Sequence, residues 1–530
     1  MMSKDTTVQL NDCVSISELF EATFKSKQNA EAIFDGERRL SYHHIEKEGI
    51  EVARGLHKSG IKRGDRVAVC LPTWYEFFVL TYAIAKIGAV LMPISTKYRH
   101  HELEYILQNA QPKAVFLTKE FDGVENFVQF QAIKEKLKTV ELISVRFEYP
   151  AIISYKKLRE MGKGIELQTL KVNVKDEVAA IIYSSGTTGK PKGVMLTHYN
   201  FFSRLMSNPR QLNNQEVFLH TATPYNHIMG LCELLIAITY RGKVVLMDQY
   251  KVETALRLVE QEKVTIRFGV PTLFILEMSN PFFHLYDMSS LKSVTMAATT
   301  ISPETIRKVK QKYGCHVQTA YGLTEICALG TFTSIEDDEF AQAETVGKVE
   351  EGVEVKVVDE QRKEVSIGQI GEIAFRSPGV MKGYYNLLER TQEVLDDEGW
   401  LYTGDLGQID QRGYLKIVGR KKEMIIRGGF NIYPREIEDV FYTHPAVQSV
   451  AVVALPDTVL GEISCATIEL KEGYKDTAED LKRFIKERIA DYKVPDHVLL
   501  IQNIPFTASG KMQKFKLKEK ILRENLVSLR

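Results

Sequence analysis

Short apolar runs alternate with amphipathic stretches from the N-terminal region as far as Tyr402, and this alternation constrains the fold more than any other feature of the chain. Apolar runs of this length are typical of buried strands, and the amphipathic stretches between them are typical of helices. Clear runs lie at residues 66–71, 114–117, 217–221, 243–247 and 294–298. The sequence therefore predicts α-helices layered on β-sheets.

The chain has 530 residues, more than one hydrophobic core usually holds, so we expect two or more domains. Strand-like residues become denser from 353 to 376, which indicates a small β-rich subdomain. Beyond Arg420 the pattern changes to that of a compact α+β unit. We place the boundary between Gly419 and Glu423, which gives a large domain of residues 1–421 and a small one of residues 422–530.

Two capping boxes mark helix starts near the ends of the chain, at Ser15-x-x-Glu18 and at Thr477-x-x-Asp480. The second box predicts a helix whose apolar face carries Leu481, Phe484, Ile485 and Ile489. The first strand of the C-terminal unit is expected at residues 423–427, before the turn at Gly428 and Gly429.

Charge and cysteine usage exclude some classes of protein. Lysine plus arginine and aspartate plus glutamate both total 69, so the formal net charge is zero. A nucleic-acid binder usually carries a basic excess, so this balance disfavours that class of partner. The six cysteines show no CxxC spacing, which indicates reduced thiols rather than a disulfide framework or a metal site.

No apolar signal segment follows the N-terminal residues Met-Met-Ser-Lys-Asp. The longest apolar run, residues 77–92, is interrupted by Lys86 and Gly88 and is stopped by Pro93. We interpret this run as a core helix followed by a strand and not as a transmembrane segment. These features predict a cytoplasmic protein.

Residues 183–194 form a run of hydroxyls and glycines with Lys190 and Lys192, between two apolar strand-like runs. Glycines let backbone N–H groups turn inward, and the hydroxyls and lysines add donors and positive charge, a combination that suits a polyphosphate. The run is not a Walker A loop, because Pro191 stands where that motif needs Ser or Thr. A flexible surface loop is the alternative interpretation.

This run resembles the AMP-binding signature of the adenylate-forming superfamily, which includes acyl-CoA synthetases, peptide-synthetase adenylation domains and beetle luciferases. Four later segments match further signatures of that superfamily in order and spacing, and the N-terminal third fits more loosely. The later segments are residues 321–325, 402–405, 419–438 and 505–511. The resemblance covers nearly the whole chain. It implies an N-terminal domain with two α/β layered subdomains and a small β-rich subdomain, and a small mobile α+β C-terminal domain.

The resemblance also implies roles for residues that contact ATP and Mg²⁺. Tyr321 would stack on adenine, Asp405 would accept hydrogen bonds from the ribose with support from Arg420, Thr324 would contact the α-phosphate region and Glu325 would bind Mg²⁺. The phosphate loop would contribute Thr187, Thr188, Lys190 and Lys192.

The C-terminal domain would alternate between two poses. Lys422 matches the hinge residue of the superfamily. Gly428 and Gly429 would let the pantetheine arm of coenzyme A pass the backbone closely, where a side chain would block it. Lys511 would bridge the acyl carboxylate and the phosphate.

The acyl substrate is predicted from residues expected around its tail. These are Met229, Leu231, Met296, Ala320, Ile326 and Leu329. They are apolar and carry no cation to pair with a second carboxylate, which favours a medium- or long-chain fatty acid. His227 matches a residue near the bound carboxyl in relatives, and a structural histidine is the alternative. Met296-Ala-Ala-Thr-Thr300, Asn226 and Lys514 depart from the usual pattern.

The sequence thus predicts an ATP-dependent acyl-CoA synthetase that forms acyl-AMP and then a coenzyme A thioester. The alternatives are an aryl-acid ligase, a stand-alone adenylation enzyme that loads a carrier protein, and a binding protein that has kept the fold. A homodimer is compatible with the sequence.

Overall fold

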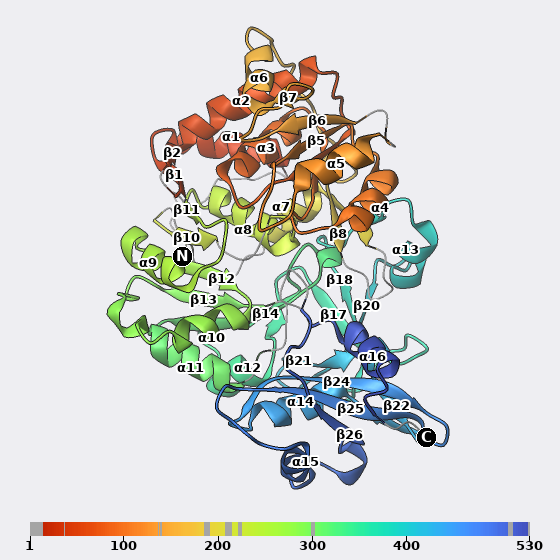
Figure 1. Cartoon of the computed structure of the whole chain (residues 1–530). Helices are drawn as coiled ribbons and strands as arrows, with labels where there is room; N and C mark the ends of the chain where they lie inside the picture. The colour runs from red at the N-terminus through yellow and green to blue at the C-terminus, as the bar shows by residue number, and fades with distance from the viewer. Residues whose placement is uncertain are drawn as a thin grey trace.

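The computed structural model describes residues 14–527, except for 37, 136, 138–139, 185–190, 207–211, 213–214, 221–224, 298–300, 302 and 507–511. Two large α/β units, a small β unit and a C-terminal α+β unit follow one another along the molecule (Figure 1). This arrangement confirms the predicted fold class.

The first α/β unit contains an eight-stranded sheet in the order β19-β9-β8-β4-β3-β5-β6-β7. Strands β8, β4, β3, β5, β6 and β7 run parallel, and β9 and β19 join one edge antiparallel. The strands are β3 (Arg66–Cys70), β4 (Val90–Pro93), β5 (Ala114–Leu117), β6 (Glu141–Ser144), β7 (Ile153–Ser154), β8 (Val178–Ser184), β9 (Lys192–Thr197) and β19 (Gly383–Tyr384). Its helices are α2 (Tyr42–Lys58), α3 (Tyr75–Lys86), α4 (His100–Ala110), α5 (Asn126–Lys134) and α6 (Tyr155–Met161).

The second α/β unit contains a nine-stranded sheet in the order β16-β15-β14-β13-β12-β10-β11-β1-β2. Its strands are β1 (Glu31–Asp35), β2 (Arg38–Ser41), β10 (Val217–His220), β11 (Lys243–Leu246), β12 (Ile266–Gly269), β13 (Ser293–Met296), β14 (His316–Tyr321), β15 (Thr331–Phe332) and β16 (Lys348–Val349). Helices of this unit and of its junction with the first are α1 (Ile16–Lys27), α7 (His198–Met206), α8 (Ile228–Thr239), α9 (Val252–Glu262), α10 (Pro271–Ser279), α11 (Pro303–Tyr313) and α12 (Glu339–Glu344).

The predicted β-rich subdomain is an antiparallel four-stranded sheet. It comprises β17 (Glu354–Val358), β18 (Gly371–Arg376), β20 (Leu401–Ile409) and β21 (Leu415–Arg420), with α13 (Leu388–Val394) beside it. The one-turn helix η3 (Lys421–Glu423) leads from β21 into the C-terminal unit.

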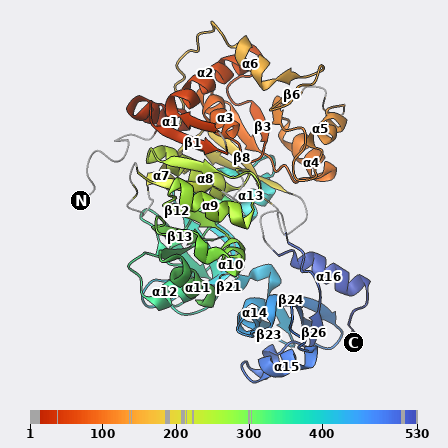
Figure 2. The ribbon, with the colours of Figure 1, turned by 60° about the vertical axis from the view of Figure 1, so that its left-hand side comes forward.

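The C-terminal unit stands apart from the rest of the chain in Figure 2. It contains β22 (Ile425–Arg427), β23 (Phe430–Ile432), α14 (Pro434–Tyr442), β24 (Val447–Asp457), β25 (Gly461–Leu470), α15 (Ala478–Lys486), β26 (His497–Leu500) and α16 (Lys514–Arg523). Two predicted bounds were wrong here. Strand β22 begins at Ile425 because η3 takes residues 421–423, and α15 ends before Ile489.

Both predicted capping boxes are present, at Ser15 and at Thr477. The longest apolar run forms α3 and β4, as predicted. Among the helices in the described part of the chain, none is both long and apolar enough to cross a bilayer.

His198 links α1 to α7 in the buried junction between the two α/β units. Its Nδ1 accepts a hydrogen bond from the Ile16 N–H at 3.2 Å, so the ring is held neutral. Burial lowers the pKa of His198 from 6.5 to about 4, against the opposing charges of Glu177 and Glu18. A proton on this ring is therefore unfavourable in the folded state.

We expect His198 to make the protein acid-labile. The unfolded chain binds a proton at His198 below about pH 6.5, and the folded chain binds it only near pH 4. As the pH falls from 6.5 to 4, this histidine therefore lowers the free energy of unfolding by about 3 kcal/mol, and below pH 4 its contribution no longer changes. Urea unfolding of wild type and His198→Asn between pH 7.5 and 4 tests this. The asparagine keeps an acceptor but does not titrate, so its curve should fall less steeply; parallel curves would contradict the prediction.

Candidate active site

Tyr321, at the end of β14, meets the paired strands β20 and β21 in a buried hydrogen-bonded cluster. The Tyr321 hydroxyl donates to Oδ2 of Asp405 at 2.5 Å, and Nε of Arg420 lies 2.6 Å from Oδ1 of Asp405. Asp405 and Arg420 are direct partners in the β20–β21 ladder. The structure thus brings together three of the predicted nucleotide-binding residues.

The Asp405 side chain is 4% exposed and that of Arg420 is 40% exposed. The arginine therefore neutralises a buried carboxylate while part of it stays hydrated. Burial raises the pKa of the Tyr321 hydroxyl well above its ordinary value, and the charge of Asp405 adds to this, so the phenol stays a donor. The sequence signature placed Asp405 beyond a glycine turn, and Gly404 does have a positive φ of 72°.

Glu325 lies in the one-turn helix η2 (Thr324–Ile326), directly after β14. Its Oε1 accepts a hydrogen bond from the Tyr384 hydroxyl at 2.8 Å, and its carbonyl accepts one from the Met381 N–H at 2.8 Å. The turn is tight: a Cβ on Gly322 would stand 1.7 Å from the Ala328 carbonyl oxygen, so only glycine fits there. Thr324 is buried beside it.

Lys192 begins strand β9 and points toward the same place. Its Nζ lies 4.6 Å from the centre of the Tyr384 ring. Burial lowers the pKa of the Lys192 ammonium; Lys422 and Arg390 add to this, while Glu325 opposes it. Glu325 and Lys422, the residue predicted to be the hinge, therefore both act electrostatically on Lys192.

Tyr384 was missed by the sequence analysis, although it contacts two predicted site residues. It belongs to the two-residue strand β19, which pairs with β9 opposite Val194. A Gly-Tyr pair is not a catalytic motif, so no chemical pattern marks Tyr384 as a site residue. The only indication would have been that this segment pairs with β9, the strand that follows the phosphate loop. Glu372 was also missed; it accepts a hydrogen bond from the Gly404 N–H at 3.0 Å.

Five of the six predicted acyl-pocket residues belong to one continuous apolar core. They are Met229, Leu231, Ala320, Ile326 and Leu329. Helix α8 is held against the turn after Glu325, since the Cys232 thiol donates to the Cys327 carbonyl at 3.8 Å.

Met296 does not join these residues. It is fully buried in a separate core cluster with Val294 and Phe274, while Ala297 belongs to the same core as Ala320. Side chains alternate across a strand, so Met296 and Val294 face one side of the sheet together. The prediction of Met296 as a lining residue is corrected for this reason.

His227 caps the N-terminus of α8, where its Nδ1 accepts a hydrogen bond from the Met229 N–H at 3.3 Å. This contact matches the structural alternative for the residue. Gly428 and Gly429 form the two-residue turn of the β22–β23 hairpin with φ values of 55° and 88°, so they need glycine for the turn itself. Passage of a ligand along them stays a prediction.

Four predicted residues lie outside the described part of the chain. They are Thr187, Thr188, Lys190 and Lys511. Strands β8 and β9 are paired up to Ser184 and Lys192 on either side of the phosphate loop. A bridge between Phe506 and Met512 encloses residues 507–511 in the same way.

Comparisons with known proteins identify the family of this chain. A family model described as AMP-binding enzyme matches residues 20–385, and one described as AMP-binding enzyme C-terminal domain matches residues 436–511. The chain is 35% identical to the medium-chain fatty-acid–CoA ligase of Escherichia coli K12, over 96% of this chain and 91% of the relative. It is 30% identical to human mitochondrial medium-chain acyl-CoA ligase ACSF2, over 96% and 88%.

A solved structure of ATP-bound MatB from Rhodopseudomonas palustris superposes with a TM-score of 0.85 at 29% identity, covering 96% of this chain and 99% of that one. Anthranilate CoA ligase AuaEII, at 24% identity and a TM-score of 0.88, shares the fold. The family model, the near full-length sequence similarity and the fold agree, and the chain belongs to the AMP-binding, adenylate-forming enzyme family.

Proposed function

We propose that this protein is an AMP-forming ligase of medium-chain fatty acids and coenzyme A. The observation that carries the proposal is the cluster of Tyr321, Asp405 and Arg420, together with the Glu325–Tyr384 pair and the apolar core that contains Ala320, Ile326 and Leu329. The named activities of the bacterial and human relatives support the acid class.

The first chemical step joins a carboxylate to the α-phosphorus of ATP. A carboxylate is ionised at neutral pH and needs no base, so its main obstacle is repulsion between anions. Lys192, Lys190 and Lys511 bring positive charge to the reacting oxygens, while Tyr321, Asp405 and Arg420 hold the nucleoside. Catalysis then rests on positioning and electrostatic stabilisation.

Mg²⁺ fits this site through Glu325. Among the described residues, no group of three or more His, Cys, Asp or Glu side chains gathers as a metal cage. Mg²⁺ in nucleotide enzymes is commonly held by one or two carboxylates together with substrate phosphates and water, which agrees with a lone glutamate here. Bound there, the ion would neutralise phosphate charge, and Tyr384 would fix the carboxylate that holds it.

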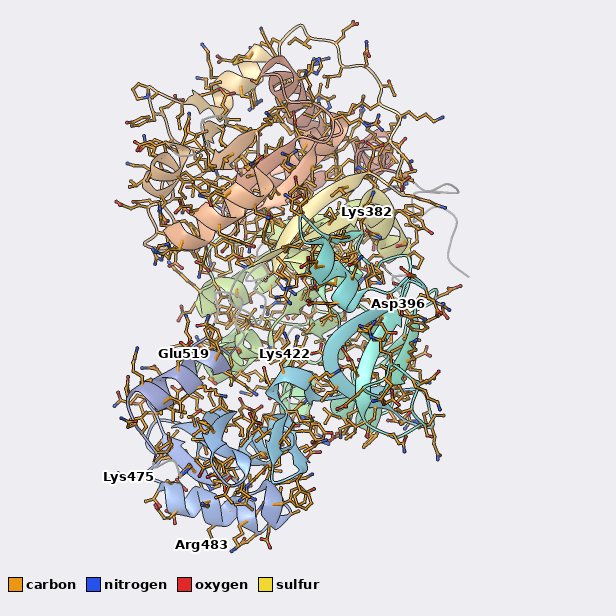
Figure 3. All side chains as sticks on the ribbon, turned by 90° about the vertical axis from the view of Figure 1, so that its right-hand side faces the viewer. Lys382, Asp396, Lys422, Lys475, Arg483 and Glu519 are labelled. Carbon is orange, nitrogen blue, oxygen red and sulfur yellow. The ribbon has the colours of Figure 1, made fainter. Side chains whose placement is uncertain are left out.

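The second step, attack of the coenzyme A thiol on the acyl-adenylate, needs different surroundings. We infer a mobile C-terminal domain of residues 422–530 that turns about Lys422, bringing Lys511 to the site in one pose and Gly428–Gly429 in the other. Figure 3 shows Lys422 at the junction between this domain and the rest of the chain. A cytoplasmic location stays part of the proposal.

The test is AMP release from ATP and Mg²⁺ over fatty acids of increasing length, aryl acids and amino acids, each with and without coenzyme A. We expect coenzyme A-dependent AMP release with the highest kcat/KM for medium-chain fatty acids. A preference for aryl acids would change the proposed substrate class from fatty acids to aryl acids. Adenylate formation without coenzyme A turnover would favour a carrier-loading enzyme. Silence over the panel would contradict the proposal.

A further inference from the structure

The short hinge segment is fastened on both sides by ion pairs to opposite domains. On the N-terminal side, Lys421 Nζ lies 2.8 Å from Oε2 of Glu372 in β18. On the C-terminal side, Glu423 Oε2 lies 3.0 Å from Nζ of Lys514 in α16. Lys422 is the single residue between these two anchors.

Lys514 is held by two carboxylates at once. Its Nζ also lies 2.8 Å from Oε1 of Glu438 in α14, and that oxygen accepts a further hydrogen bond from the Val452 N–H at 2.7 Å. The Lys514 side chain is only 18% exposed. Burial acts to lower the pKa of its ammonium, but Glu438 and Glu423 outweigh burial and raise it, so the group is charged in the folded protein.

The same lysine stands just beyond the segment that contains Lys511. The two ends of residues 507–511 are joined by the bridge between Phe506 and Met512 and by a hydrogen bond from the Gln513 N–H to the Pro505 carbonyl at 2.8 Å. Lys514 follows Gln513 directly, as the first residue of α16. The backbone contacts that flank the Lys511 segment thus lie directly before Lys514 in the chain. Two ion pairs then connect Lys514 to Glu423 at the hinge and to Glu438 in α14.

We propose that Lys514 is a positioning residue that ties the Lys511 segment to the hinge, so that rotation at Lys422 delivers Lys511 to the acyl and phosphate groups in a defined place. This inference rests on the proposed function. Because Lys511 acts in formation of the acyl-adenylate, the Lys514 ion pairs should affect that half-reaction only. Misplacement of a reacting group by about 1 Å can cost on the order of 100-fold in rate, so loss of the tie is measurable.

The experiment compares Lys514→Met, Lys514→Arg and a matched control, Lys520→Met, an exposed lysine of the same helix. Adenylate formation is followed as pyrophosphate release without coenzyme A, and thioester formation is followed from supplied acyl-adenylate. We expect Lys514→Met to slow the first half-reaction about 10- to 100-fold and the second less than about threefold. Lys514→Arg should recover most of the rate, because arginine can pair with both carboxylates.

Glu423→Gln is the second variant, since it weakens the hinge-side pair and leaves Lys514 paired with Glu438. It should slow adenylate formation selectively, by about three- to tenfold, even if Lys514→Met folds poorly. An equal decrease in both half-reactions, or no decrease in either variant, would overturn the positioning role while the wild type stays active. A wild type silent in both half-reactions would overturn the proposed function and this inference with it.

Discussion

Lys511→Ala should lose adenylate formation by about 10²- to 10³-fold, the usual cost of removing one group that stabilises charge in the transition state. It should still convert supplied acyl-adenylate and coenzyme A to the thioester at close to the wild-type rate. The lysine offsets repulsion between carboxylate and phosphate, and that repulsion is absent once the acyl–phosphate bond exists. In the proposed mechanism, the second half-reaction takes place in the other domain pose, in which Lys511 is not at the site.

The measurement uses the two half-reactions separately, with Lys516→Ala as the control. Lys516 is an exposed lysine of α16, so its removal changes the charge of the domain without touching the site. The ratio of the two rates is the informative quantity, because a general loss of folded protein lowers both equally. If Lys511→Ala lowered both half-reactions to the same extent, the two-pose mechanism would be wrong.

Much of the fold could be predicted because local patterns and tertiary packing agree. The apolar run before the phosphate loop lies in β8, and the capping boxes at Ser15 and Thr477 are present with both reciprocal bonds. In these segments the turn residues, the helix caps and the spacing of apolar residues all favour the same secondary structure. The signatures 321–325 and 402–405 lie far apart in sequence, and the structure joins them through Tyr321 and Asp405.

The errors at Met296 and Tyr384 have a common physical origin. Both depend on tertiary packing, which decides the face of a sheet that a residue occupies and the strand with which its own strand pairs. Met296 was assigned to the pocket, yet a strand buried on both faces gives no signal for which side each residue takes. Tyr384 acts on Glu325, 59 positions earlier in the chain, through a strand of two residues. Strands this short have no periodicity from which their partner could be inferred.

Asp405→Asn should raise the KM for ATP about 30- to 100-fold and change kcat by much less. The Asp405 carboxylate is oriented by Tyr321 and Arg420, and we expect the two ribose hydroxyls to donate hydrogen bonds to its oxygens. Hydrogen bonds to a charged acceptor contribute about 1.5–3 kcal/mol, and asparagine keeps one acceptor oxygen, so one such bond is lost. The ribose does not react, so ground state and transition state lose it equally.

Stability should decrease less than binding in this variant. Removal of one partner from a buried ion pair costs most when the other charge cannot reach water, and the 40% exposed Arg420 can. Asp410→Asn is the matched control: Asp410 closes the turn between β20 and β21 by accepting from the Arg412 and Tyr414 N–H groups, away from the site. ATP binding by calorimetry and KM should change together for Asp405→Asn and not for Asp410→Asn. A fall in kcat at unchanged ATP affinity would instead place Asp405 in the reacting geometry, because only a group bound more tightly in the transition state acts on kcat alone.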